Sequence, residues 1–227
     1  MLFDLINGRL TFESAIATIL AVLLIIFLVL PFHEWAHAFV GYKLGDVSVK
    51  YRKRLTLNPI EHIDPLGALC LLLFGFGWAK PVPIDSRYFK KPKRDMAIVA
   101  LAGPLANLIA ATVGGLFLNM YVTFCARFIY TNTAGYIILS FLVNYVFINV
   151  ILAVFNLIPI PPLDGSKVLY ACLPDRILYK FIPYERYFIL IVLALMWVGV
   201  LSYPINFVAN YIYNGIMWLT GLPFSFL

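Results

Sequence analysis

Long apolar segments with almost no charge are the feature that most constrains this chain. A bilayer core about 30 Å thick takes roughly 20 apolar helical residues to cross. Segments near that length run over about 15–42, 96–118, 136–158, 187–203 and 205–222. The sequence therefore predicts an all-α polytopic membrane protein with about four or five transmembrane helices.

The composition excludes other classes of protein. Of the 227 residues, 63% are hydrophobic and 12% are charged, whereas an ordinary soluble domain is about one quarter charged. A water-soluble globule is therefore excluded, and the 19 Phe and 14 Tyr residues exclude disorder. We expect one membrane domain over residues 1–227, with a core over 15–173 and C-terminal helices over 184–225.

A shorter apolar stretch, residues 65–78, lies between the first two predicted spans. Clusters of Lys and Arg flank it, within 43–54 before it and 80–94 after it. If the stretch crossed the membrane, one cluster would face outward, against the positive-inside rule. We therefore predict a re-entrant element, with residues 67–83 as a candidate edge for pairing with an extended substrate.

Basic residues also predict the orientation. The net charge of +6 comes mostly from loops beside apolar segments, where it determines topology, so we do not expect nucleic-acid binding. The sequence predicts a multi-pass protein of the cell membrane, with the N-terminus outside and the basic loops in the cytoplasm. The last segment carries Asn206, Asn210 and Asn214 on one helical face. That stripe suits helix contact or an interfacial position equally well.

An H-E-x-x-H motif, His33-Glu34-x-x-His37, lies inside the first span. Residues four apart share one face of a helix, so both imidazoles can bind one zinc ion, with Glu34 beside the metal-bound water as general base. Ionisable residues at bilayer depth are costly and are functional by default. The alternative is that both histidines bond to neighbouring helices while Glu34 stays protonated or pairs with a basic residue.

A third zinc ligand is needed, because catalytic zinc keeps three protein ligands and one open position. Asp164 is the candidate, since it follows Pro159, Pro161 and Pro162, which end the third span while the sequence is still apolar. This places a carboxylate on unwound backbone near the level of the H-E-x-x-H motif. The alternative is that Asp164 caps a short helix over 166–173.

Three motifs, in this order over about residues 15–173, carry a resemblance: His33-Glu34-x-x-His37, Gly103-Pro104-Leu105-Ala106-Asn107, and Asn156-Leu157-Ile158-Pro159 leading to Leu163-Asp164-Gly165. The chain resembles the site-2 protease family of intramembrane zinc metalloproteases, in a bacterial-type minimal form without a PDZ or regulatory domain. The resemblance implies that His33, His37 and Asp164 are the zinc ligands, Glu34 is the catalytic base, and Asn107 and Asn156 bind substrate.

The chemistry of the two asparagines is compatible with that role. An amide at membrane depth can bond to an extended substrate or to the oxyanion of the reacting carbonyl. For Asn107 the alternative is helix association, because it lies in a stripe of small residues with Gly103, Ala111 and Gly114. Asn156 is favoured as functional because it lies beside the broken helix end. The roles of Asn144 and Asn149 stay open.

The expected function is hydrolysis of peptide bonds within or near transmembrane segments of membrane-anchored proteins, that is, regulated intramembrane proteolysis, with one Zn²⁺ per chain. Expected partners are transmembrane protein or peptide substrates, the lipid bilayer and a membrane regulator protein. Two other classes stay open. One is a membrane transporter or channel that uses these polar groups as an ion path, and the other is a catalytically silent scaffold on the same fold.

Overall fold

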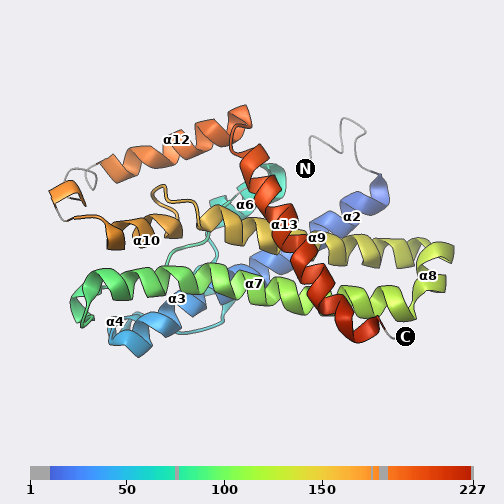
Figure 1. Cartoon of the computed structure of the whole chain (residues 1–227), viewed down its shortest axis with the longest axis horizontal. Helices are drawn as coiled ribbons and strands as arrows, with labels where there is room; N and C mark the ends of the chain where they lie inside the picture. Colours follow the sequence, from blue (N-terminus) through green and yellow to red (C-terminus); the bar gives the residue numbers. More distant parts are fainter. Residues whose placement is uncertain (1–10, 75–76, 175, 179–183, 226–227) are drawn as a thin grey trace.

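The first predicted span is one long helix with an irregular turn inside it. The computed structural model describes residues 11–74, 77–174, 176–178 and 184–225, and the helix comprises α2 (Phe12–Leu24), a π-helical turn (Ile25–Val29) and α3 (Leu30–Leu44) (Figure 1). Thr11 begins it by accepting a hydrogen bond from the Ser14 amide, and Gly45 ends it at φ 120°. Pro31 follows the π-helical turn and has no N–H to continue the α-helical hydrogen-bond pattern.

The segment after this helix folds back on itself. Short helices α4 (Ser48–Tyr51) and α5 (Pro59–His62) precede α6 (Pro65–Phe74). Beyond α6 the chain returns, because Ile63 pairs with Ala79 in an antiparallel bridge and the Lys80 amide donates to the His62 carbonyl at 2.7 Å. Both ends of the predicted re-entrant stretch therefore lie together.

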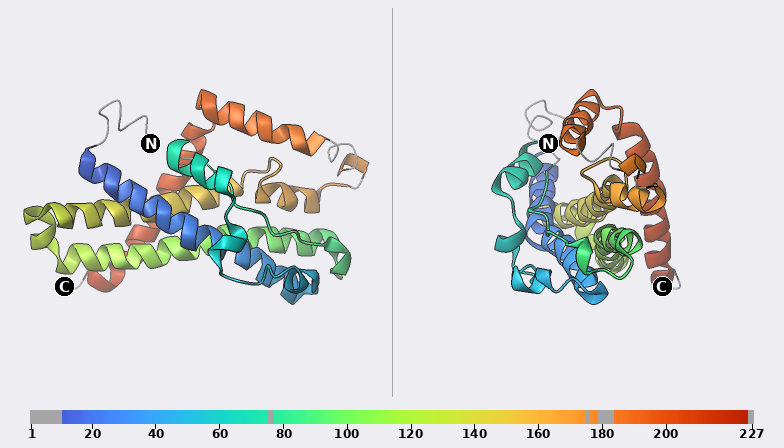
Figure 2. Two further views of the ribbon diagram at one scale, coloured as in Figure 1. Left: turned by 180° about the vertical axis from the view of Figure 1, so that it is seen from behind. Right: turned by 90° about the vertical axis from the view of Figure 1, so that its left-hand side faces the viewer.

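Two antiparallel helices form the centre of the molecule. They are α7 (Pro92–Phe124) and α9 (Thr133–Asn156), joined by the short helix α8 (Ala126–Thr131). Figure 2 shows α7 and α9 side by side, and α2 packs on α9 while α3 packs on α7. The main hydrophobic core lies between them and includes the fully buried Ile25, Val146 and Val150.

Further helices with described bounds follow α9. These are α10 (Asp164–Cys172), α12 (Glu185–Val198) and α13 (Ser202–Gly221), and a 3-10 turn (Leu222–Phe224) follows. Helix α13 crosses α7 and α9 obliquely (Figure 1). The Asn119 amide on α7 fixes this crossing by donating to Thr220 Oγ1 at 2.8 Å.

The described residues confirm an all-α multi-pass membrane protein without a sheet, and three helices are long and apolar enough to span: Phe12–Leu44, Pro92–Phe124 and Thr133–Asn156. The predicted fourth and fifth spans are helices, but neither is among the three. Helix α12 has only 14 residues because Gly199, at φ 83°, follows its last residue, and 14 residues are too few to cross a bilayer. Helix α13 has 20 residues, but its asparagine stripe lowers its apolar character.

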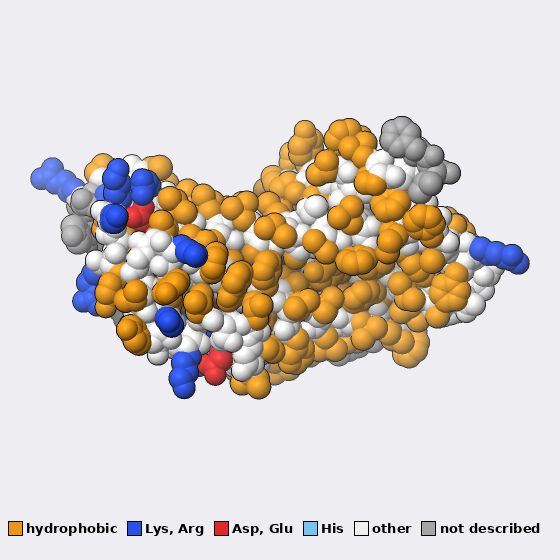
Figure 3. Space-filling view, turned by 90° about the horizontal axis from the view of Figure 1, so that it is seen from below, with side chains coloured by type: hydrophobic (Ala, Val, Ile, Leu, Met, Phe, Trp, Pro, Cys, Tyr) orange, Lys and Arg blue, Asp and Glu red, His pale blue; other side chains and the backbone are white. Residues whose placement is uncertain are grey.

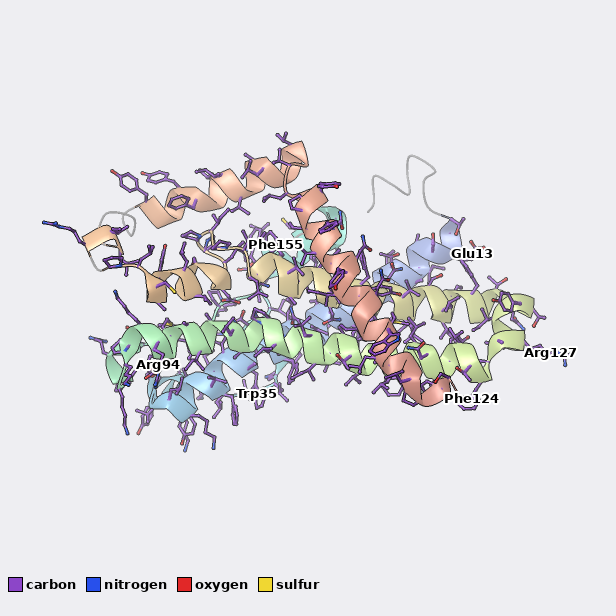
Figure 4. All side chains as sticks on the ribbon, viewed as in Figure 1. Glu13, Trp35, Arg94, Phe124, Arg127 and Phe155 are labelled. Carbon is purple, nitrogen blue, oxygen red and sulfur yellow. The ribbon has the colours of Figure 1, made fainter. Side chains whose placement is uncertain are left out.

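Charge is distributed unevenly along the molecule. Figure 3 shows Lys and Arg side chains gathered at one end and a broad hydrophobic band over the middle. Arg94 and Arg127 lie near opposite ends (Figure 4). The predicted position of the N-terminus, residues 1–10, lies outside the described residues.

Close packing of α7 on α9 depends on Gly114. A Cβ built there would lie 2.7 Å from the Tyr145 ring and 3.1 Å from Val146 Cγ2. We predict that Gly114→Leu destabilises the protein by about 1–3 kcal/mol through overpacking, measured as a lower thermal unfolding temperature in detergent. Gly215→Leu is the matched control, because a Cβ at Gly215 meets nothing within 4 Å. Equal unfolding temperatures for both variants would contradict this packing.

Candidate metal centre

His33 and His37 lie one turn apart on α3 and direct their Nε2 atoms toward the same point. The two atoms are 3.1 Å apart, and the side chains are nearly buried, at 7% and 8% exposed. The four-residue spacing places both rings on the face of α3 that packs against α7. The motif therefore forms the paired site that its spacing predicts.

Asp164 completes the cluster from a distant part of the sequence. Its Oδ2 lies 3.3 Å from His33 Nε2 and 3.2 Å from His37 Nε2. Ligands of a tetrahedral zinc ion, at 2.0–2.1 Å from the metal, are about 3.3 Å from one another. The three atoms thus have the spacing and the nitrogen and oxygen chemistry that zinc takes, and the cluster fits a metal ion.

The backbone around Asp164 explains how it reaches the histidines. Helix α9 ends at Asn156, and the following loop contains a cis peptide bond between Pro161 and Pro162. Gly165 then packs against the Leu157 carbonyl so closely that a Cβ has no room. The N-cap of α10 is Leu163, and Asp164 is its first helical residue. The alternative that Asp164 serves as the N-cap is therefore wrong, and its carboxylate is directed at the imidazoles.

Interactions on the far side of His37 fix its orientation. Its Nδ1 lies 2.8 Å from the Val99 carbonyl of α7, which can only accept a hydrogen bond. Nδ1 therefore carries the proton, and Nε2 keeps its lone pair toward the cluster. His33 Nδ1 is buried without a partner among the described residues.

Asp164 lies outside the three long helices, and its pKa is displaced. Burial alone would raise the pKa of this carboxyl, but when the imidazoles of His33 and His37 are protonated, as they can be without a metal, their hydrogen bonds and charge outweigh burial and hold the pKa below the ordinary range. Asp164 is therefore an ionised carboxylate, the form that binds a metal.

Glu34 lies beside the cluster on the same helix. It is 9% exposed, and its Oε2 accepts a hydrogen bond from the Val82 amide at 2.9 Å. Val82 follows α6, in the predicted re-entrant region. The returning chain thus orients a carboxylate that lines the same cavity as the histidines and Asp164.

This cavity has a volume of about 410 Å³. Besides the cluster, its walls include Trp78, Phe155, Asn156 and Lys167. Phe155, labelled in Figure 4, lies on α9 close to where the chain leaves for α10. The predicted zinc ligands and the predicted base Glu34 therefore line one cavity, together with Asn156, one of the two predicted substrate-binding residues.

The two asparagines differ in position. Asn156 lines the cavity, and its Nδ2 donates to the Leu152 carbonyl at 2.9 Å. Asn107 is fully buried in α7 and does not line the cavity, and its two amide atoms have no hydrogen-bond partner among the described residues. Asn144 donates to Thr18 Oγ1 at 3.0 Å, which joins α9 to α2, and Asn149 donates to the Tyr145 carbonyl.

Gly103 has a contact that the sequence did not reveal. A Cβ built on it would lie 2.5 Å from Nε2 of His33, so the histidine pair packs directly on the α7 backbone. Sequence reasoning placed Gly103 in a stripe of small residues for helix association. The sequence did contain a signal for this contact. Gly103 stands directly before Pro104 inside a helix, and a glycine there weakens the helix unless close packing requires it.

Comparison with known proteins identifies the family. Residues 20–199 match the description "Peptidase family M50". The chain is 38% identical over 182 residues to "Putative zinc metalloprotease YwhC" of Bacillus subtilis, covering 79% of this chain and 82% of that protein. It is 32% identical to "Putative zinc metalloprotease Rip2" of Mycolicibacterium smegmatis, over 72% of this chain and 61% of that protein.

A more distant relative is "Zinc metalloprotease MJ0392" of Methanocaldococcus jannaschii, which is 29% identical over 72% of this chain and 37% of that protein. No solved structure matches. The chain belongs to peptidase family M50, the site-2 protease family of zinc metalloproteases.

Gly103 gives a test of the metal centre. We predict that Gly103→Ala displaces the imidazoles and lowers zinc affinity about 10- to 100-fold, as loss of a supporting contact does at other metal sites. Zinc retained after dialysis against a chelator series measures this. Gly221→Ala is the control, because a Cβ there meets only ordinary contacts of 3.6 Å or more. Unchanged zinc affinity in Gly103→Ala would contradict the assigned packing.

Proposed function

We propose that this chain is an intramembrane zinc endopeptidase that cleaves peptide bonds within or near transmembrane segments of membrane-anchored proteins. The observation that carries the proposal is the burial of His33, His37, Asp164 and Glu34 around one cavity between helices long enough to span a membrane. His33, His37 and Asp164 hold one zinc ion in this proposal.

A bound zinc ion would act as a Lewis acid on the scissile carbonyl and would lower the pKa of its water ligand. Glu34 takes the proton from the attacking water and delivers it to the leaving amine. The Val82 amide binds one carboxylate oxygen, Oε2, so Glu34 is held in place while Oε1 remains for proton transfer. The Val99 carbonyl keeps His37 in the tautomer that a metal ligand needs.

Substrate must be extended in the cavity, because a peptide in a helix has its carbonyl groups hydrogen-bonded. Asn156 lines the cavity and is proposed to bind the unwound substrate, while the segment around Trp78 offers an edge beside it. Asn107 does not line the cavity, so a role in substrate binding requires α7 to move or substrate to reach deeper.

The proposed orientation places the basic end in the cytoplasm and the N-terminus outside, with residues 1–227 forming one membrane domain and 65–78 re-entrant. It rests on the gathering of Lys and Arg at one end of the molecule (Figure 3). The proposed partners are transmembrane substrates, the bilayer and a membrane regulator protein.

A cysteine accessibility experiment tests this orientation. The chain has three free cysteines, Cys70, Cys125 and Cys172, which are first replaced by Ser. We predict that Arg127→Cys reacts with an impermeant maleimide in intact cells, whereas Lys53→Cys reacts only after permeabilisation. The reverse pattern would show that the basic end faces outward.

Glu34→Gln tests the reaction. We expect cleavage of a co-expressed single-span substrate to fall about 100- to 10,000-fold, because general base catalysis is lost, while the zinc content and the unfolding temperature are kept. Membrane proteomics of cells with wild-type or Glu34→Gln protein identifies substrates that accumulate uncut. Glu61→Gln is the matched control, since Glu61 is on α5 and does not line the cavity.

The same variant separates the proposal from its competitors. If the protein were a transporter or channel, it would carry an ion flux, and no peptide fragment would disappear in Glu34→Gln. A catalytically silent scaffold would give identical fragments with wild-type and variant protein. Either result would refute the endopeptidase.

A further inference from the structure

The returning segment, residues 79–85, forms part of the wall of the metal-centre cavity. It leaves the bridge to Ile63, passes Glu34 and continues into the 3-10 turn Ser86–Tyr88. The residues of the segment that line the cavity are Ala79, Pro81, Val82 and Ile84. No residue of the segment is helical, so its position depends on contacts with other parts of the chain.

Backbone amides bind the returning segment at both ends and in the middle. At one end the Lys80 amide donates to the last carbonyl of α5 at 2.7 Å, and in the middle the Val82 amide donates to Glu34. At the other end the Asp85 amide donates to Oδ2 of Asp46 at 2.8 Å. Two carboxylates, one on α3 and one in the turn after it, therefore hold the segment by their side chains.

Asp46 is a fully buried carboxylate, at 0% exposed, and it directly follows Gly45, where α3 ends. Its Oδ1 accepts a hydrogen bond from the Ser48 amide at 2.9 Å, which is an ordinary turn contact between residues two apart. Its Oδ2 bond to the Asp85 amide joins residues 39 apart, and the turn does not need it. Burying a carboxylate is costly unless hydrogen bonds compensate, and the two amides supply that compensation.

The link between Asp85 and Val82 is short and stiff. Three residues span at most about 10 Å, and the ring of Pro83 fixes one backbone angle between them. Ile84 packs on α3 at Gly41, where an added Cβ would lie 3.1 Å from Ile84 Cδ1. A displacement at Asp85 is therefore transmitted to the Val82 amide.

We propose that Asp46 is a positioning residue for Glu34. Its carboxylate fixes the end of the returning segment, and with it the Val82 amide that binds Oε2 of Glu34. Oε1 is thereby held toward the cavity for proton transfer, and loss of such alignment lowers the rate of a reaction. The proposal rests on the proposed function, because Glu34 acts as the base only in that reaction.

Hydrogen exchange in the full-length protein tests the contact without a cleavage assay. Asp46→Ala removes both acceptor oxygens. We expect the Val82 and Asp85 amides to exchange about fivefold to tenfold faster, the factor that one hydrogen bond contributes, while the zinc content is kept. Mass spectrometry with electron-transfer fragmentation separates the two amides.

Asp95→Ala is the matched control. Asp95 is 1% exposed and also accepts a backbone amide, that of Lys91 at 3.0 Å, but its hydrogen bonds are to Lys91 and Arg94, outside the returning segment. We expect exchange over residues 79–85 to be the same as in the wild type. Asp46→Asn keeps one acceptor oxygen, so it should give a smaller change than Asp46→Ala, and it serves as the test if Asp46→Ala fails to fold.

Steady-state cleavage tests the consequence for Glu34. We expect Asp46→Ala to lower kcat about 10- to 100-fold, as loss of a supporting contact does at other sites. KM should change little, because the contact supports the base and not the substrate. Asp46→Asn should lower kcat less, and Asp95→Ala should keep the wild-type value.

Wild-type exchange at Val82 in Asp46→Ala would overturn the proposal, even with a lower kcat, because Asp46 would then act by another route. An equal fall of kcat in Asp95→Ala would also overturn it, since the loss would reflect general destabilisation. A wild-type protein that cleaves no substrate would instead refute the proposed function. Exchange at Val82 would still decide whether Asp46 holds the amide that binds Glu34.

Discussion

The close approach of two imidazole nitrogens and a carboxylate oxygen in an apolar interior is the constraint on which the rest of this structure depends. His33 Nε2, His37 Nε2 and Asp164 Oδ2 lie 3.1–3.3 Å from one another. Polar groups buried without compensation cost several kcal/mol. A cation held among the three atoms would remove that cost in a chain with only 12% charged residues.

The neighbouring elements are arranged to support this cluster. Gly103 lets α7 approach the imidazoles, and the Val99 carbonyl sets the tautomer of His37. Gly165 lets α10 begin against the end of α9, so that its first residue reaches the histidines. The Val82 amide reaches Glu34 from the returning segment. The contacts of Gly103, Val99 and Val82 join residues far apart in the sequence, and all four contacts use backbone atoms or a missing side chain.

Features set by local helical spacing and by prolines could be predicted from the sequence, and contacts between distant segments could not. Helical spacing alone was enough to pair His33 with His37, whereas the prolines after α9 made Asp164 a candidate and left capping of α10 as the alternative. The contacts of Gly103 and Val82 depend on tertiary packing, which hydrophobic patterns do not encode. The predicted second span, 96–118, was shorter than α7 because patterns of hydropathy omit polar helix ends such as Lys93. The predicted fourth span was wrong in length, because Gly199 ends α12 after 14 residues.

The most direct test of the central claim is X-ray absorption at the zinc edge of the purified full-length protein. We predict one zinc ion per chain with four nitrogen or oxygen ligands at about 2.0–2.1 Å and the scattering pattern of two imidazoles. We also predict that Asp164→Asn changes this spectrum while the helical content is kept. A sulfur ligand, a single imidazole, or a spectrum unaffected by Asp164→Asn would contradict the assignment of His33, His37 and Asp164.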